Sequence, residues 1–271
     1  MGFITNLKKL HFPVKSPLNN KGVYRVMLAE SASQRNAALR LRHRVFHNEI
    51  RHHKKIIFDF RRDLDHIDRF ADHLIVTHKK NQFVKEKVIG TYRLLNYWQA
   101  ERAGGFYSSS EFDLCSFLSA VNSKMLLEVS RSCIHPKYRN SQVLRLLWSG
   151  LYQYIKSNNS SGLFGCASFW QTDPLLVQDE INFLRKHHAL DISVPALQSV
   201  KIDVPYKPTN GDPNVLMQKL PPLIRSYLRV GAKFGREAII DQEFKSIDVF
   251  VYFKTEHLTE SYKKKFDRPT P

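Results

Sequence analysis

Two charged side chains interrupt an otherwise apolar run of residues, and they are the first candidates for chemistry in this chain. The run covers residues 126–134 and carries Glu128 and Arg131. Burying an unpaired charge is costly, so charged side chains in a buried strand need a partner or a substrate. Glu128 is a candidate general base, or an anchor for a substrate amine. The alternative is a structural ion pair of Glu128 with Arg93 or Arg131.

Side chains alternate between the two faces of a strand. Alternation in this run places Glu128, Ser130 and Ser132 on one face, and Val129, Arg131 and Cys133 on the other. Glu128 and Arg131 can then meet in one site only if the strand bulges between them. Ser130 has no triad partner at a recognisable spacing, which disfavours a hydrolase. The run is therefore predicted to be an active-site strand.

A basic turn follows this strand and leads into a long amphipathic segment. Strand, basic turn and helix together place backbone N–H groups and a cation around a phosphate. Arg139, Asn140 and Ser141 are the residues that would hold such a group. No glycine lies between Ile134 and Gly150, so the signal is weaker than a glycine-rich loop. A solvated basic turn is the alternative.

Acidic and histidine side chains gather in residues 63–73. A metal site is one interpretation of Asp63, Asp65, Asp68, Asp72 and His73, but pairing with the arginines before them or orienting a substrate cation is favoured. In so basic a region, His43 and His47 are expected to be exposed, as are His52 and His53. No metal site is predicted.

Composition limits the class of protein. The 271 residues suit one large domain, and 42% hydrophobic residues are enough for a substantial core. The net charge of +17 suits an anionic partner, such as a membrane face, an acidic protein or nucleic acid. Three widely spaced cysteines argue against a disulfide framework and favour a reducing cytosol. No apolar run is long enough to span a bilayer, and no signal peptide is recognised.

Periodicity predicts a mixed sheet. Expected strands cover residues 24–29, 73–77, 88–95, 126–134, 163–169 and 247–253. Expected helices run from Ser31 or Ser33 to about residue 50, and over 141–156, 173–187 and 223–230. Gly90 indicates a bulge or a close backbone approach. The order predicts an α/β (α+β) fold with a mixed central sheet and helices on both faces.

The remaining segments are expected to be less regular. Residues 1–21 are interpreted as a basic arm, either an amphipathic turn on a membrane surface or a frayed terminus. Residues 51–68 are expected to be irregular and residues 106–114 a structured loop. Residues 22–271 then form a single domain, with an insertion near 190–218.

Several of these segments, in order, carry a family pattern. The chain resembles the ornithine–acyl-carrier-protein N-acyltransferases of bacterial ornithine-lipid synthesis, a GNAT-like family related to acyl-homoserine-lactone synthases. The matching segments are residues 41–49, 72–76, 88–95, 106–112, 127–139 and 220–232.

The resemblance implies an enzyme that moves a 3-hydroxyacyl chain from acyl-carrier protein to the α-amine of ornithine. It assigns catalysis to Glu128, Arg131 and Ser130, and substrate binding to Arg44, Phe46, Asp72, His73 and Arg93. Arg139, Asn140 and Ser141 would bind phosphopantetheine. No bound cofactor or metal is implied; the thioester on acyl-carrier protein is the donor. A cytoplasmic protein with peripheral contact at the inner membrane face is expected, and no nucleic acid partner.

One departure leaves alternatives open. GNAT proteins usually carry a glycine-rich turn where this chain has residues 139–144, which argues against coenzyme A as the donor. Another acceptor, such as glycine, lysine or S-adenosylmethionine, would keep the fold. A non-catalytic basic module that binds membrane or nucleic acid is the third hypothesis, although no nucleic-acid-binding motif is present.

Overall fold

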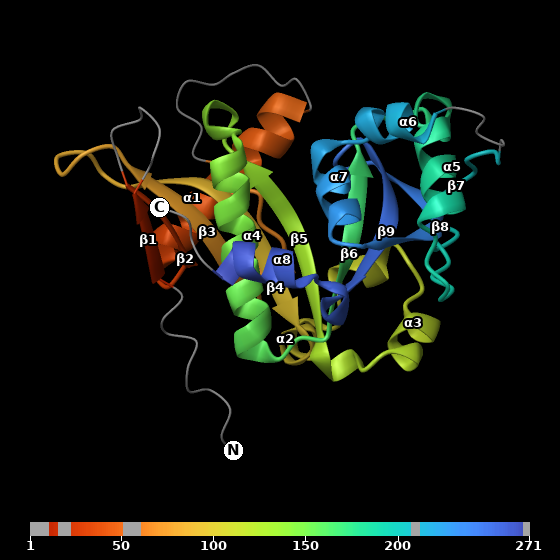
Figure 1. The fold of residues 1–271 in the computed structure, drawn as a ribbon, viewed down its shortest axis with the longest axis horizontal. Coiled ribbons are helices and arrows are strands. Elements are labelled where there is room, and N and C mark those ends of the chain that lie inside the picture. The colour runs from red at the N-terminus through yellow and green to blue at the C-terminus, as the bar shows by residue number, and fades with distance from the viewer. Residues whose placement is uncertain (1–10, 16–22, 51–60, 207–211, 268–271) are drawn as a thin grey trace. The chain divides into compact units, whose positions relative to one another are not determined.

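The computed structural model describes residues 11–15, 23–50, 61–206 and 212–267, and the chain divides into two compact units (Figure 1). The first unit comprises residues 1–95, 129–160 and 260–271, and the second comprises residues 96–128 and 161–259. The chain passes from the second unit into the first within a single strand, β5 (Leu126–Ile134). The amphipathic turn expected within residues 1–10 and the pair His52 and His53 lie outside the described residues.

The first unit is built on an antiparallel meander. Its strands, in spatial as well as chain order, are β1 (His11–Lys15), β2 (Val23–Leu28), β3 (Asp72–Lys79) and β4 (Lys87–Asn96), followed by the later part of β5. Its helices are α1 (Ala32–His43), α4 (Ser141–Asn158) and α8 (Glu260–Asp267). Short helical turns cover Arg44–Ile50, His66–Arg69 and Pro136–Tyr138.

Helix α1 begins where the sequence predicts. The Ser31 hydroxyl accepts a hydrogen bond from the Gln34 N–H, and the Gln34 side chain accepts one from the Ser31 N–H, which completes a capping box. The apolar positions Ala38, Leu39 and Leu41 are buried. The helix continues as a π-helical turn to Ile50, so the predicted end is also confirmed.

Helix α4 packs closely on the first unit's strands. A Cβ built on Gly150 would lie 2.5 Å from Val26 Cγ2 and 2.9 Å from Leu74 Cδ1. Near the helix start, a Cβ on Gly90 would lie 3.3 Å from Val143. The β3–β4 register also shifts beside Gly90, so both expectations for this glycine are confirmed.

The second unit has its own strands around an aromatic core. Its strands lie in the order β6 (Gly162–Phe169), β9 (Ser246–Lys254), β8 (Lys233–Asp241) and β7 (Lys201–Ile202). The first residues of β5 pair with β6 in parallel, whereas the β6–β9, β9–β8 and β8–β7 pairs are antiparallel. The rings of Phe112, Phe117, Phe164 and Phe250 pack edge to face or tilted.

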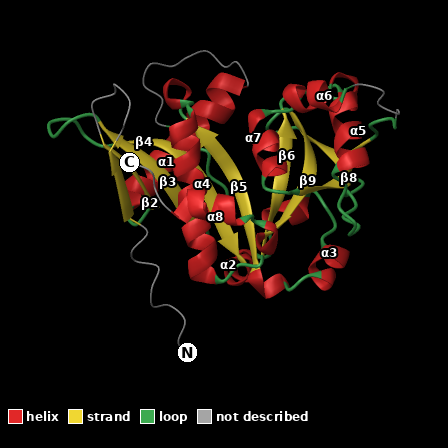
Figure 2. Ribbon diagram, in the orientation of Figure 1, coloured by secondary structure: helices red, strands yellow, loops and turns green. Residues whose placement is uncertain are grey.

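Five helices and four short turns complete the described part of this unit. Figure 2 draws the helices in red. The helices are α2 (Tyr97–Ala103), α3 (Cys115–Ala120), α5 (Gln178–His187), α6 (Pro213–Lys219) and α7 (Pro222–Arg229). The turns are Tyr107–Ser110, Ser123–Met125, Pro174–Leu176 and Thr255–His257.

The predicted mixed α/β class is confirmed, because one parallel strand pair occurs among antiparallel ones. Three strands escaped prediction for local reasons. Strand β7 is two residues long and lies in the segment interpreted as an insertion. Strand β8 has a register shift between Phe234 and Ala238, which hides its alternation. Strand β1 contains Pro13, a residue restricted to edges of sheets, and lies in the segment interpreted as an arm. No helix in the described part of the chain is long and apolar enough to cross a membrane.

Candidate active site

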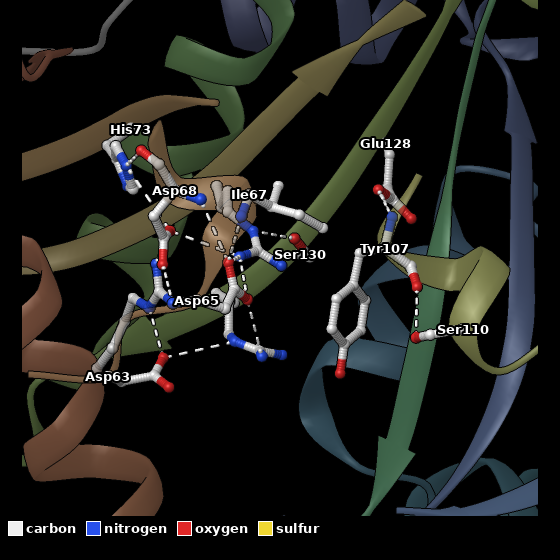
Figure 3. A network of polar contacts seen from close by, with 12 residues as sticks. Asp63, Asp65, Ile67, Asp68, His73, Tyr107, Ser110, Glu128 and Ser130 are labelled. Atoms are coloured by element: carbon white, nitrogen blue, oxygen red, sulfur yellow. Dashed lines mark hydrogen bonds and ion pairs between the residues drawn. The ribbon is translucent and has the colours of Figure 1, made fainter. Parts of the chain in front are cut away.

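Three arginines and three aspartates of the first unit form an alternating ion-pair network (Figure 3). Arg42 binds Asp63 through Nε at 2.6 Å and Asp68 through Nη1 at 2.5 Å. Arg93 Nη1 contacts both oxygens of Asp65, at 2.6 and 2.5 Å. Pairing with an arginine that precedes the segment is thus confirmed for Arg42, whereas Arg93 comes from a later strand.

Arg131 joins this network from strand β5. Its guanidinium lies 3.4 Å from Asp63 and 3.3 Å from Asp65. Arg93 also reaches Asp68 at 3.5 Å. Asp63, Asp65 and Asp68 therefore each contact two arginines. Equal numbers of opposite charges allow the group to remain buried.

Burial and charge oppose each other in this network. Burial alone would raise the pKa of Asp63, but His47 and the guanidinium groups of Arg42 and Arg131 hold it well below its usual range. The pKa of Asp65 is lowered in the same way, with Arg93 outweighing burial. Both carboxylates are therefore ionised at neutral pH.

The loop that carries the aspartates is shaped by those same side chains. Asp65 caps the short helix His66–Arg69 by accepting hydrogen bonds from the Ile67 and Asp68 N–H groups. The Asp68 carboxylate in turn accepts a hydrogen bond from the Asp65 N–H. This capping box fixes both carboxylates before they meet an arginine.

Ser130 and Arg131 break the predicted alternation of β5. The Ser130 hydroxyl accepts a hydrogen bond from Arg93 Nε at 2.9 Å, while Arg131 contacts Asp65, the other partner of Arg93. Arg131 has φ of +52°, a left-handed conformation that non-glycine residues seldom adopt. The left-handed backbone at Arg131 interrupts the strict alternation that assigned these two residues to opposite faces.

The predicted substrate-binding residues of the first unit fall at several places. Phe46 is buried, and Asp72 accepts a hydrogen bond from the Tyr154 hydroxyl of α4 at 2.8 Å. His73 is buried beside Asp68, with Nε2 3.4 Å from its carbonyl oxygen. Burial lowers the pKa of His73, against the opposing effect of Asp68.

The histidines at the end of α1 and in the turn that follows it differ from expectation. His43 is buried rather than exposed and stacks on the His47 ring at 4.8 Å. His47 Nε2 lies 3.6 Å from Asp63 Oδ1, at the edge of the ion-pair network. His47 belongs to the π-helical turn Arg44–Ile50 and is partly buried.

A second cluster of the first unit is basic and surrounds His135. Arg44 Nη1 lies 3.2 Å and Lys87 Nζ 3.1 Å from His135 Nε2. Burial, Lys87, Arg44, Lys137 and Arg139 together lower the pKa of His135 to about 4. The ring is thus neutral at neutral pH among several cations.

The predicted phosphopantetheine residues stand next to this basic cluster, at the start of α4. Arg139 is exposed and donates from Nε to the Ile134 carbonyl oxygen at 3.2 Å. Asn140 caps the helix by accepting from the Val143 N–H, and Ser141 is its first residue. A helix N-terminus beside cations is suited to an anion.

Glu128 belongs to the second unit, where it contacts the turn Tyr107–Ser110. Its carboxylate accepts hydrogen bonds from the Tyr107 N–H at 2.7 Å, the Ser108 N–H at 2.7 Å and the Ser108 hydroxyl at 2.6 Å. Glu128 is fully buried and holds the start of the turn Tyr107–Ser110 (Figure 3). The structured loop predicted at residues 106–114 is thereby fastened to β5.

An acidic cluster of the second unit was missed by sequence reasoning. The carboxylates of Glu111, Asp241 and Asp248 offer oxygens that lie within 4.8 Å of one another. Cys166 Sγ lies 2.8 Å from Glu111 Oε2 and 3.4 Å from Ser108 Oγ. The signal was available: Asp248 interrupts the apolar strand β9 just as Glu128 interrupts β5.

Comparison with known proteins identifies the family. Residues 41–149 match the family model of the acetyltransferase (GNAT) domain. The chain is 35% identical over 252 residues to the L-ornithine N(alpha)-acyltransferase of Brucella abortus (strain 2308), covering 90% of this chain and 89% of that one. It is 34% identical over 255 residues to the L-ornithine N(alpha)-acyltransferase of Rhizobium meliloti (strain 1021), covering 90% and 84%.

One solved structure similar to this chain is that of a CoA-dependent acyl-homoserine lactone synthase, BjaI, with SAM and isopentyl-CoA. Its TM-score is 0.47 and its sequence identity is 12%. The alignment covers 87% of this chain and 82% of that chain. The sequence relatives and the matched domain, taken together, make the chain a GNAT-type acyltransferase that belongs to the L-ornithine N(alpha)-acyltransferase family.

Proposed function

We propose that this chain transfers a 3-hydroxyacyl group from acyl-carrier protein to the α-amine of L-ornithine, the first step of ornithine-lipid synthesis. The observation that carries the proposal is the 35% identity to an L-ornithine N(alpha)-acyltransferase over 90% of the chain. A GNAT acyltransferase uses an acyl thioester as its donor. The thioester supplies a good leaving group, so a covalent enzyme intermediate is not needed.

The basic cluster around His135 supports a phosphorylated donor. Arg44 and Lys87 lie 3.2 and 3.1 Å from His135 Nε2, and Lys137 and Arg139 add further positive charge around this buried neutral ring. A phosphate there would neutralise their repulsion and meet the N–H groups at the start of α4. We place the phosphate of phosphopantetheine against this cluster, with Arg139, Asn140 and Ser141 at its edge.

The net charge of +17 favours acyl-carrier protein as the bearer of that phosphopantetheine. An acidic carrier approaches a basic surface faster and binds it better, and salt weakens both effects. The acyl product is a membrane amphiphile, so a cytoplasmic location with peripheral contact at an anionic membrane face suits the reaction.

Glu128 is the proposed acceptor of the proton that the attacking amine loses. The amine nitrogen attacks the thioester carbonyl carbon, its proton passes to the carboxylate directly or through the Ser108 hydroxyl, and the thiolate leaves. The hydrogen bond from Ser108 to Glu128 at 2.6 Å supplies the relay. The left-handed Arg131 supports a role for β5 backbone N–H groups in stabilising the tetrahedral oxyanion, because strained residues gather at active sites.

The direct test supplies the purified chain with 3-hydroxyacyl-carrier protein and, in separate reactions, ornithine, lysine, glycine or S-adenosylmethionine. Mass spectrometry should find mono-acylated ornithine. A product with another acceptor would retain the chemistry and reject ornithine. No product from any acceptor, with folded protein and a donor that another acyltransferase can use, would reject the enzyme and favour a binding module.

Two variants test whether Glu128 accepts the proton of the attacking amine. Glu128→Gln should lower kcat at least 100-fold, and Ser108→Ala should lower it less, because the direct route to the carboxylate remains. Near-ultraviolet circular dichroism controls for the turn that Glu128 fastens. A Glu128→Gln enzyme with wild-type kcat would remove Glu128 from the chemistry.

A further inference from the structure

The acidic cluster of Glu111, Asp241 and Asp248 is not used by the mechanism above. Glu111 and Asp248 are buried, and Asp241 is partly buried. Their oxygens lie within 4.8 Å of one another, in a chain whose net charge is +17. Asp248 accepts a hydrogen bond from the Ser168 hydroxyl at 3.0 Å, and Glu111 contacts the Cys166 thiol. Asp241 accepts a hydrogen bond from the Phe244 N–H at 2.8 Å, and each of these partners is electrically neutral.

A separate observation marks the same place as a binding site. Ser246 is fully buried, and its hydroxyl oxygen has no hydrogen-bond partner among the described residues. Ser246 faces Asp241 across the β8–β9 pair and lies two residues before Asp248 on β9. Directly opposite residues, and residues two apart, point to the same face of a sheet. The Ser246 hydroxyl is therefore aimed at the side of the sheet that carries the two aspartates.

Burial and like charges keep one member of the cluster protonated. Burial and the neighbouring carboxylates, first that of Asp248, raise the pKa of Glu111 to about 8, although Cys166 and Tyr107 oppose the shift by hydrogen bonding. Like charges this close cannot all ionise without a counter-charge. A bound cation would restore the ionised form of Glu111 and release its proton.

The cluster is also connected to the proposed proton acceptor. Ser108 donates its hydroxyl hydrogen to Glu128, and the same oxygen lies 3.4 Å from Cys166 Sγ. Cys166 in turn lies 2.8 Å from Glu111. One buried polar network of the second unit thus joins the carboxylate assigned to the reacting amine with a group of carboxylates suited to a second amine.

We propose that Glu111, Asp241 and Asp248 bind the side-chain ammonium of a diamino-acid acceptor, with Ser246 as a further acceptor of its hydrogen bonds. The inference rests on the proposed function and assigns the residues that select a diamino acid over a monoamino acid. An ammonium presents three N–H donors, which matches three carboxylates. A hard divalent cation takes six or more oxygen ligands or retains several waters, which suits this half-closed set of side chains less well.

The experiment compares ornithine with norvaline, which has the same α-amino acid portion and chain length but no terminal amine. Both compete in one reaction for limiting acyl-carrier-protein donor, and mass spectrometry gives the ratio of their kcat/KM values. Asp248→Asn and Glu111→Gln should each lower the preference for ornithine 10-fold or more, mainly through KM, because a hydrogen-bonded charge pair is lost. Asp113→Asn, an exposed acid two residues from Glu111, is the matched control and should leave the ratio unchanged.

The outcomes separate this inference from the proposed function. If the wild-type chain acylates ornithine and both variants keep its preference, the cluster is not the selector. If the wild-type chain acylates no amino acid, the proposed function itself fails. If added Mg²⁺ restored a variant's preference for ornithine, the cluster would be assigned to a metal ion and not to an ammonium group.

A measurement on the wild-type chain covers the case in which the variants do not fold. Isothermal titration calorimetry at pH 7 in two buffers of different ionisation enthalpy counts the protons exchanged on binding. Ornithine should release more protons than norvaline, because its terminal ammonium ionises Glu111. Equal proton release by the two amino acids would overturn the proposal.

Discussion

Ser130 and Arg131 are consecutive residues of one strand, yet both reach the same ion pair. Ser130 accepts from Arg93 Nε at 2.9 Å, and Arg131 Nη2 lies 3.3 Å from Asp65 Oδ2. The left-handed backbone at Arg131 makes this possible, since regular alternation would turn the two side chains apart. The strain at Arg131 is thus held in place by a buried network of opposite charges.

Asp68→Asn should destabilise the first unit strongly. Asp68 holds Arg42, a fully buried guanidinium, through two hydrogen bonds, and removing one partner of a buried ion pair costs about 3–5 kcal/mol. Urea unfolding measures the loss of free energy. Glu30→Gln, the same chemical change at an exposed site of the first unit, is the control and should cost under about 0.5 kcal/mol. Equal stability of both variants would show that Arg42 finds another partner.

Gly150→Ala should also destabilise the protein, although alanine is the better helix former by about 1 kcal/mol. The new methyl group would lie 2.5 Å from Val26 Cγ2, and a β-branched side chain cannot swing away easily. Overpacking of this kind costs about 1–3 kcal/mol, so the net effect should be a lower melting temperature. Gly231→Ala, where a Cβ meets nothing within 4 Å but φ is +90°, separates backbone strain from crowding. A higher melting temperature for Gly150→Ala would mean that α4 shifts to make room.

Because the pKa of Glu111 is raised, the free energy of unfolding should fall as pH rises. Its folded-state pKa of about 8 lies above the ordinary value of about 4.3, so the folded chain holds a proton that the unfolded chain has lost across that window. The contribution is complete below pH 4 and declines by up to about 1.4 kcal/mol per pH unit until pH 8. Chemical denaturation from pH 5 to 8 should show a shallower decline for Glu111→Gln than for the wild type. Parallel curves would contradict the raised pKa.

The pKa of His135 should change when a phosphate binds to the basic cluster. Its pKa of about 4 lies below the ordinary value of about 6.5, so the unfolded chain binds a proton that the folded chain refuses, and stability falls as pH drops from 6.5 to 4. A bound phosphate offsets the surrounding cations and should raise the pKa of His135. A pH titration followed by NMR measures the pKa of His135 in the presence of 4′-phosphopantetheine, with unphosphorylated pantetheine as the control. The exposed ring of His66 is the internal reference. An identical titration in both ligands would place the phosphate elsewhere.

The sequence by itself determined the elements that local rules govern. Helix α1 starts directly after Ser31 because a serine followed three residues later by glutamine satisfies the free N–H groups of a helix end. Strand β5 covers residues 126–134 as predicted, because its apolar composition and the His135–Pro136 break are both visible in the chain. The family pattern was likewise legible, because its motifs occur in order along the chain.

Tertiary structure alone decided which charges meet. Asp63 lies 21 residues from Arg42, and Arg131 lies 66 residues from Asp65, so no periodicity connects them. The same holds for the acidic cluster, where Glu111 and Asp248 come from a turn and a strand far apart in the chain. Composition required that buried charges find partners, but the choice of partner depends on distances that only the folded chain sets.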